Sequence, residues 1–224
     1  MQSKFILALT SAAVIAVAAG GAHAAISFGG YQTALNPGET LITGFEGGPA
    51  LSAVTFSQPG YSLTGTATLF TGSQDGVTAA PAISALSRDT TQYLSIQAGQ
   101  SATLETQPLQ EISFYVGSLD DFNSFTFHLA DGATEVVTGS TLAALPGMDA
   151  NGNQTGFTTN GRLTFTFGSA VNSVELASSS NAFEVSDIAG VGGVVPEPSV
   201  WAMMILGLGA AGGALRRRRA LAVA

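Results

Sequence analysis

The sequence predicts an all-β domain, an antiparallel β-sandwich that is jelly-roll-like, flanked by an N-terminal signal helix and a C-terminal transmembrane helix. Short runs with apolar residues at alternate positions fill residues 27–188. Gly, Asn, Asp and Pro separate these runs at spacings of roughly 8 to 12 residues, and no amphipathic crossover helix lies between them. We therefore expect two packed antiparallel sheets. An eight-stranded barrel is the structural alternative, which the sequence does not separate from a sandwich.

The clearest strands are residues 123–129 and 162–167, where polar and apolar residues alternate and one face carries two phenylalanines. Arg162 falls on the opposite, polar face of its strand. Two connections, residues 71–89 and 141–160, are long enough to be functional or mobile. Further strands are expected at residues 40–45, 61–70, 92–96, 101–106, 111–116, 134–138, 173–177 and 182–188.

The N-terminus has the pattern of an export signal. Lys4 supplies a positive charge, residues 5–19 are uncharged and mostly apolar, and Ala22 and Ala24 are small residues at the two positions that signal peptidase reads. The alternative is a buried N-terminal helix, which would need a polar face that this run lacks. We therefore expect signal peptidase to cleave after Ala24 and to release residues 1–24.

The C-terminal segment has a stop-transfer pattern. Residues 199–215 carry no charge, and Arg216, Arg217, Arg218 and Arg219 follow directly. As a helix with a rise of about 1.5 Å per residue, the apolar segment would span roughly 26 Å, just enough for a bilayer core of about 30 Å. The positive-inside rule then leaves the arginines in the cytoplasm and the domain outside. Four adjacent like charges disfavour the alternative, a helix buried in the domain.

Just before this segment, Pro196, Glu197 and Pro198 are followed by Trp201 and Ala202. The motif is followed by one apolar helix and then by a basic end. These three parts, in this order, resemble the PEP-CTERM sorting domain in its PEPxxWA form. The resemblance implies an exosortase as the partner that recognises Pro-Glu-Pro and removes the helix. It also implies a Gram-negative bacterium and a transient stay in the inner membrane. The cell surface or an exopolysaccharide biofilm matrix is then the final location.

The chain therefore divides into a signal peptide at residues 1–24, a β-sandwich domain at residues 25–192 and a sorting tail at residues 193–224. Arg88 and Arg162 are the domain's two basic residues, against fourteen acidic residues, so its formal net charge is −12. Such a domain repels phosphate backbones, and we expect no nucleic-acid partner. Because the sequence has no cysteine, it offers no disulfide and no thiolate for catalysis or metal binding.

Few residues of the domain suggest catalysis. His128, the domain's one histidine, falls on a polar strand face, and no Gly-x-Ser-x-Gly elbow is present. We interpret Asp120 and Asp121 as turn residues rather than a glycosidase pair. The expected function is a non-enzymatic surface or matrix protein, with a carbohydrate-binding module as the first alternative and a secreted hydrolase as the second. The tyrosines that could stack on sugars are Tyr31, Tyr61, Tyr93 and Tyr115.

One loop carries a partial calcium-binding pattern. Asp149, Asn151 and Asn153 place three oxygen ligands at alternate positions, as in the first half of an EF-hand loop. The second half of that pattern is missing, because Gln154 stands where glycine is needed and Asn160 where a bidentate glutamate is needed. We interpret the segment as a flexible polar loop, with a weak calcium site as the alternative. No other cofactor is expected.

Overall fold

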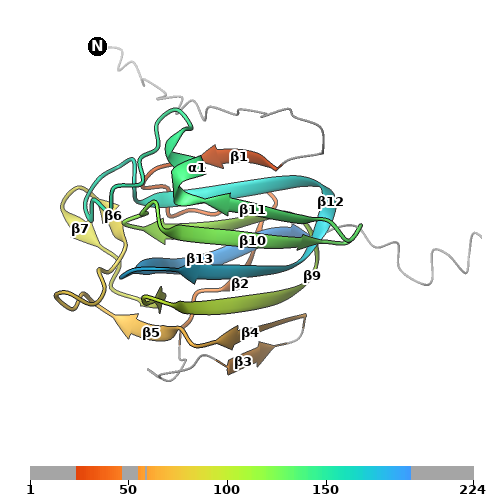
Figure 1. The fold of residues 1–224 in the computed structure, drawn as a ribbon, viewed down its shortest axis with the longest axis horizontal. Coiled ribbons are helices and arrows are strands. Elements are labelled where there is room, and N and C mark those ends of the chain that lie inside the picture. The colour runs from red at the N-terminus through yellow and green to blue at the C-terminus, as the bar shows by residue number, and fades with distance from the viewer. Residues whose placement is uncertain (1–23, 47–54, 59, 193–224) are drawn as a thin grey trace, which may run out of the picture. The chain divides into compact units, whose positions relative to one another are not determined.

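A computed structural model describes residues 24–46, 55–58 and 60–192, which form an all-β domain (Figure 1). Within these ranges every strand pairing is antiparallel, which confirms the predicted fold class. No helix in the same ranges is long and apolar enough to cross a membrane. The expected signal helix, sorting motif, transmembrane helix and arginine block lie outside the described residues.

The described residues contain thirteen strands and one short helix, α1 (Gly139–Ala143). Thr138 caps this helix, because its hydroxyl accepts a hydrogen bond from the backbone N–H of Thr141. The strands are β1 (Ala25–Phe28), β2 (Thr40–Thr43), β3 (Thr55–Gln58), β4 (Tyr61–Gly65), β5 (Thr68–Thr71), β6 (Ala82–Ser84), β7 (Ser87–Arg88), β8 (Gln92–Ile96), β9 (Gln100–Gly117), β10 (Asn123–Leu129), β11 (Thr134–Thr138), β12 (Gly161–Ser178) and β13 (Phe183–Gly192).

The two long strands β9 and β12 organise both sheets. They pair with each other from Gly161 opposite Val116 to Ser178 opposite Gln100. The first part of β12 also pairs with β1 and its last part with β10, while β9 pairs first with β4 and then with β13. All strands except the separate β6-β7 pair form one hydrogen-bonded network, which divides into two sheets that share β9 and β12. One sheet runs β3-β4-β9-β12-β10-β11. The other runs β1-β12-β9-β13, with β2 and the β8-β5 pair continuing from β13.

The breaks predicted inside these long strands are wrong. The strands expected at 101–106 and 111–116 are one strand, and so are those expected at 162–167 and 173–177. Between the two halves the register shifts, close to Pro108, which has no N–H to give to the ladder. A residue that interrupts the alternation thus marks the point where a strand passes from one sheet to the other.

The single strand expected at 61–70 is also wrong, since β4 and β5 pair with different strands. Gly65 ends β4 at a point where a Cβ atom would collide with the carbonyl oxygen of Ser101. The absence of a side chain lets the chain pass closely against the start of β9 and turn toward β8. The strands expected at 92–96, 123–129 and 134–138 are confirmed with the predicted bounds.

Phenylalanines from both sheets meet in the core. Phe125 of β10 is fully buried, and its ring lies 5.1–5.2 Å from the rings of Phe114, Phe165 and Phe183, measured between centroids. Those three rings belong to the parts of β9, β12 and β13 that form the second sheet, whereas β10 pairs only with β11 and with the last part of β12. Contact across two sheets is the geometry of a sandwich, and the alternating phenylalanines predicted for β10 and β12 produce it.

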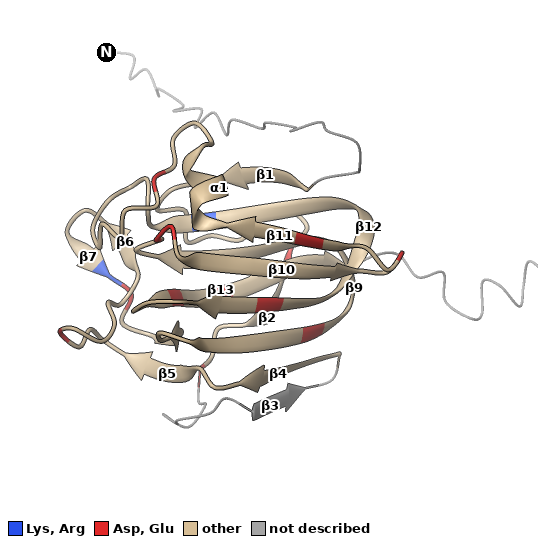
Figure 2. Ribbon diagram, in the orientation of Figure 1, with Lys and Arg blue, Asp and Glu red and all other residues tan. Residues whose placement is uncertain are grey.

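The domain's two basic residues are far outnumbered by acidic ones, as the ribbon coloured by residue type shows (Figure 2). Arg88 lies in β7, where its guanidinium donates to the carbonyl oxygens of Ala80 and Gln154 at 2.8 and 3.0 Å. Arg162 lies at the start of β12. Both cations are therefore held in contacts within the domain rather than forming a basic surface.

The core contact gives a direct stability prediction. Phe125→Ala should lower the free energy of unfolding by about 3–5 kcal/mol, because it removes a buried ring from the contact between the sheets. Val136→Ala is the matched control, since Val136 in β11 is 58% exposed, and its effect should stay within about 0.5 kcal/mol. Urea denaturation measures both values. A loss below about 1 kcal/mol for Phe125→Ala would contradict this packing.

Candidate functional site

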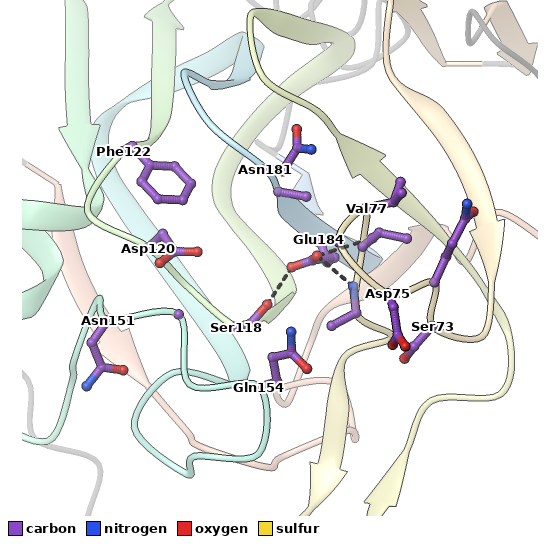
Figure 3. A pocket seen from close by; sticks show the side chains of 16 residues that line it. Ser73, Asp75, Val77, Ser118, Asp120, Phe122, Asn151, Gln154, Asn181 and Glu184 are labelled. Atoms are coloured by element: carbon purple, nitrogen blue, oxygen red, sulfur yellow. Dashed lines mark hydrogen bonds between the residues drawn. The ribbon is translucent and has the colours of Figure 1, made fainter.

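Both long connections of the sequence line one pocket at the end of the sandwich (Figure 3). Its volume is about 380 Å³, within the range of roughly 300–1,000 Å³ typical of small-molecule sites. Four chain segments contribute: the β5–β6, β9–β10 and α1–β12 connections, and the start of β13 with the residues before it. The lining residues are Ser73, Gln74, Asp75, Gly76, Val77, Thr78, Ala79, Ser118, Asp120, Phe122, Asn151, Gly152, Gln154, Asn181, Ala182 and Glu184.

Glu184 of β13 connects three of the pocket's backbone segments. Its Oε1 accepts hydrogen bonds from the backbone N–H of Ala79 at 3.0 Å and the hydroxyl of Thr78 at 3.2 Å. Its Oε2 accepts a hydrogen bond from the hydroxyl of Ser118 at 2.6 Å. The carboxylate thus holds the β5–β6 connection and the end of β9 against β13, and its own oxygens are occupied by protein donors.

The burial of Glu184 follows from the chain around it. Strand alternation places Glu184 on the face opposite the core side chains Phe183 and Val185. That face would be exposed in an isolated sheet, but the β5–β6 connection covers it, and Glu184 is 1% exposed. Burial is the main reason that the pKa of Glu184 is raised to about 7, although its three hydrogen bonds lower it.

Asp120 presents a carboxylate of a different kind. It lies in the turn between β9 and β10, where its backbone N–H donates to the side-chain oxygen of Asn123 at 2.8 Å. Among the described residues, no group donates a hydrogen bond to its carboxylate. The absence of a side chain on Gly152 leaves room for that carboxylate, since a Cβ there would collide with Oδ1. Burial, and then the charge of Asp121, raises the pKa of Asp120 to about 6.

The remaining lining is polar with one aromatic ring. The ring of Phe122 is half-buried and lies on the same side of the opening as Asp120, while Ser73 and Asp75 lie on the other side (Figure 3). Amide side chains come from three of the contributing segments, and none of the lining residues is basic. The pocket therefore offers many hydrogen-bond acceptors, several amide donors and one apolar surface.

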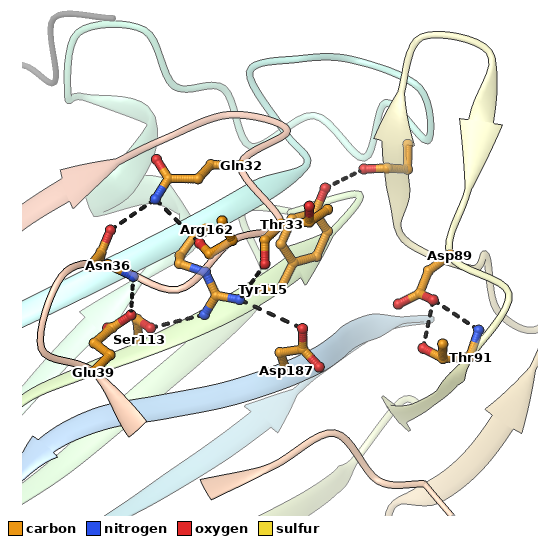
Figure 4. A network of polar contacts seen from close by, with 12 residues as sticks. Gln32, Thr33, Asn36, Glu39, Asp89, Thr91, Ser113, Tyr115, Arg162 and Asp187 are labelled. Atoms are coloured by element: carbon orange, nitrogen blue, oxygen red, sulfur yellow. Dashed lines mark hydrogen bonds and ion pairs between the residues drawn. The ribbon is translucent and has the colours of Figure 1, made fainter. Parts of the chain in front are cut away.

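A second polar cluster surrounds Arg162, on the strand face that the sequence predicts to be polar (Figure 4). The β1–β2 connection covers this face, and Arg162 is 1% exposed. Its guanidinium donates to the hydroxyl of Ser113 at 3.0 Å and the carbonyl oxygen of Thr33 at 3.3 Å, and lies 3.7 Å from Asp187. Burial lowers the pKa of Arg162, and Glu39 and Asp187 oppose this. These contacts fix the connection to the sheet.

The proposed calcium ligands make local contacts with their own loop. Asp149 accepts from the hydroxyl of Thr158 at 2.8 Å, Asn151 from the backbone N–H of Asn153 at 3.1 Å, and Asn153 from that of Thr155 at 3.0 Å. Such contacts to the backbone two residues ahead are turn chemistry of asparagine. In the described part of the chain, no three His, Cys, Asp or Glu side chains gather closely enough to hold a metal ion. Calcium binding stays a prediction.

The structure separates the other candidate residues. His128 is exposed toward the far end of β10 from Asp120, beside the hydroxyl of Thr134. Tyr93 and Tyr115 are buried and donate to backbone carbonyls, so they belong to the core rather than to a sugar-stacking surface. Tyr31 is partly exposed and packs edge-on against a phenylalanine ring, while Tyr61 lies partly buried in β4.

Ala24, the last residue before the expected signal-peptidase cut, is described and Ala22 is not. Ala24 is 5% exposed, and its backbone N–H donates to both carboxylate oxygens of Glu135 at 2.9 and 3.1 Å. Cleavage after Ala24 stays a prediction.

Glu184 and Phe122 are pocket residues that the sequence analysis does not identify. A usable signal exists for Glu184, because a glutamate between Phe183 and Val185 sits among buried strand residues. The predicted turn at Asp120 is confirmed, because the backbone N–H of Asn123 donates to the carbonyl oxygen of Asp120 at 3.2 Å. This turn faces the pocket, which the sequence does not predict.

Comparison with known proteins identifies the tail. A family model described as the PEP-CTERM protein-sorting motif matches residues 194–219. The chain carries a PEP-CTERM sorting motif. This confirms the resemblance that Pro196, Glu197 and Pro198 indicate, and the motif marks an exported protein that an exosortase sorts. No curated protein matches this chain at a significant level.

Solved structures give weak similarities to this chain. A peptidoglycan O-acetylesterase structure is 13% identical over 70% of this chain and 35% of its own, with a TM-score of 0.34. The catalytic domain of a GH87 α-1,3-glucanase is 14% identical, and the match covers 80% of this chain and 30% of that structure, with a TM-score of 0.36. The structure of CtCBM11 is 15% identical, and the match covers 70% of this chain and 96% of that structure, with a TM-score of 0.22. The chain thus spans about a third of the first two structures, and these TM-scores assign it neither fold family nor activity.

The buried carboxylate makes domain stability depend on pH in a defined direction. The folded-state pKa of Glu184, about 7, exceeds its ordinary value of 4.5, so the folded domain binds this proton more tightly than the unfolded chain. The stabilisation is present below about pH 4.5 and is lost as the pH rises through 7. At about 1.4 kcal/mol per pKa unit, the loss is about 3 kcal/mol.

Glu184→Gln should therefore flatten the fall in unfolding free energy between pH 5 and pH 8, as measured by urea denaturation at a series of pH values. Asp120 and Asp187 also have raised pKa values and remain in both proteins, so the difference isolates Glu184. Glu105→Gln, on an exposed position of β9, should keep the original slope. Equal slopes for the original protein and Glu184→Gln would rule out this carboxylate as the source.

Proposed function

We propose that this exported protein is a non-enzymatic component of the cell surface or of an exopolysaccharide matrix, released there after an exosortase removes its tail. The observation that carries the proposal is the PEP-CTERM motif at residues 194–219, which follows directly after an all-β domain ending with β13. The domain is the part that would remain after processing, and the tail would serve as the sorting signal.

The physical properties of the tail fit this route. Signal peptidase would free the N-terminus, and the apolar residues 199–215 would then hold the chain in the inner membrane. Pro196 and Pro198 would disfavour helix around Glu197, so that an extended segment would be presented to a protease at the membrane surface. The four terminal arginines would stay on the cytoplasmic side until the tail is removed.

The arrangement of the described side chains supports a non-enzymatic role. Hydrolysis through a serine needs a hydroxyl that a substrate can reach, but Ser118, which donates to Glu184, is only 5% exposed and Glu184 only 1%. His128 lies away from the pocket acids, so no described histidine could act as the base of a hydrolase in this pocket.

Carbohydrate binding is the second candidate function, and the pocket favours it. Proteins bind sugars through carboxylates that accept from the sugar hydroxyls, through amides that donate and accept, and through aromatic rings that contact the apolar sugar faces. Asp120, Gln154 and Phe122 supply these three kinds of group around one opening. A pull-down with the host's own polysaccharide tests this candidate, and an absence of saturable binding would dismiss it.

The sorting route predicts defined ends for the mature protein. Mass spectrometry of the protein from its native host should show termini at Ala25 and near Pro196. Glu197→Ala should instead leave the tail in place and the chain in the membrane fraction, because the motif that an exosortase recognises is broken.

Glu175→Ala is the matched control, because it removes one acid from β12 and should leave processing unchanged. If the unaltered protein in its mature form still ended beyond Arg219, the chain would be a plain membrane anchor, and the proposed processing would be wrong.

A further inference from the structure

We infer that the pocket between residues 73–79 and 151–154 binds a sugar unit that carries a protonated amine. The inference deepens the carbohydrate-binding candidate and rests on it. It names the site, the chemical class of the ligand and the residue, Asp120, that would hold the charged group.

The pocket is built around a fixed wall. Glu184 is held by donors from Thr78, Ala79 and Ser118, at 2.6 to 3.2 Å, so its carboxylate positions the surrounding backbone and has little capacity left for a ligand. Asp120 differs, because it lines the pocket and no described group donates to its carboxylate. Of the two carboxylates, Asp120 is therefore the one available to a ligand.

The charge of the lining selects the ligand class. Asp75, Asp120 and Glu184 contribute acids, and no lining residue is basic. An anionic sugar such as a uronic acid would be repelled by these groups. The hydroxyls of a neutral sugar can donate to Asp120 and to the amides, but they carry no positive charge to compensate that of the carboxylate. A protonated amine donates up to three hydrogen bonds and compensates that charge.

The raised pKa of Asp120 agrees with this choice, because it records an ionised form that the protein alone stabilises poorly. A cation bound beside the carboxylate would return this pKa toward its ordinary range.

Phe122 supplies the apolar contact. Its ring lies at the same opening as Asp120 (Figure 3). Aromatic rings pack against the apolar faces of sugars, and they attract an ammonium group within about 6 Å of the ring. The same ring thus favours both parts of an amine-bearing sugar.

A divalent cation fits the pocket less well. Calcium needs six to eight oxygen ligands with several carboxylates among them, and no three acidic or histidine side chains gather closely enough in the described ranges. Glu184 already accepts three hydrogen bonds from the protein.

Isothermal titration calorimetry on the exported protein, purified from its native host, tests the inference at neutral pH. The probes are the trisaccharides of glucosamine, N-acetylglucosamine and galacturonic acid, and calcium chloride alone. We expect saturable binding of the glucosamine trisaccharide, at least tenfold tighter than that of its acetylated counterpart, and no binding of the galacturonic acid trisaccharide. Asp120→Asn and Phe122→Leu should each weaken the first interaction at least tenfold.

Two controls separate the pocket from general attraction to an acidic protein. Glu105→Gln makes the same charge change as Asp120→Asn on an exposed part of β9, and Phe157→Leu changes a phenylalanine that is 57% exposed and outside the pocket lining. Neither control should alter the affinity. Thermal unfolding shows whether each variant is folded. Because Asp120→Asn and Phe122→Leu are independent pocket variants, the test stays decisive if one of them does not fold.

Several results would overturn the inference. Equal affinity for the acetylated trisaccharide would remove the role of the amine. An equal loss in Glu105→Gln would reduce the effect to net charge, and a saturable calcium signal lost in Asp120→Asn would assign the pocket to a metal. If Asp120→Asn still binds the host polysaccharide in the pull-down, the pocket inference fails while carbohydrate binding stands. The mature termini test the sorting route separately.

Discussion

The pocket depends on a single buried carboxylate. Glu184 projects from the face of β13 that points away from the phenylalanine core, and its three hydrogen bonds hold the β5–β6 connection and the end of β9 in place. A buried anion is stable only where enough donors compensate for lost water. Because the donors come from the loops themselves, the position of the loops and the solvation of the carboxylate determine each other.

The sequence predicts much of the fold and little of the pocket, for a physical reason. Alternation shows which residues share a strand face, so the phenylalanines of β10 and the class of the fold are predictable. It does not show which loop covers the opposite face. Arg162 falls on a predicted polar face and Glu184 on the face of β13 opposite Phe183 and Val185. Both are buried because the β1–β2 and β5–β6 connections fold over them. The sequence does not predict that β9 continues through Pro108, or that β12 continues opposite it, because the irregular register there looks like a break between strands.

The tail and the domain contribute to function in separate ways. The PEP-CTERM motif can be identified from the sequence because its features are local ones: two prolines, an apolar run and a basic end. A binding pocket depends on contacts between residues as far apart as Ala79 and Glu184. A tail of this kind therefore identifies the route of export, and the molecular activity has to be inferred from the folded domain.

The titration of Glu184 by nuclear magnetic resonance tests the central claim most directly. The side-chain carboxyl carbon of Glu184 and the amide proton of Ala79 can be followed together as the pH is raised. Both signals should change with one midpoint near pH 7, because the N–H of Ala79 donates to a carboxylate whose pKa is raised by burial. A midpoint near 4.5 for the carboxyl carbon, or an Ala79 signal that does not follow it, would contradict the account.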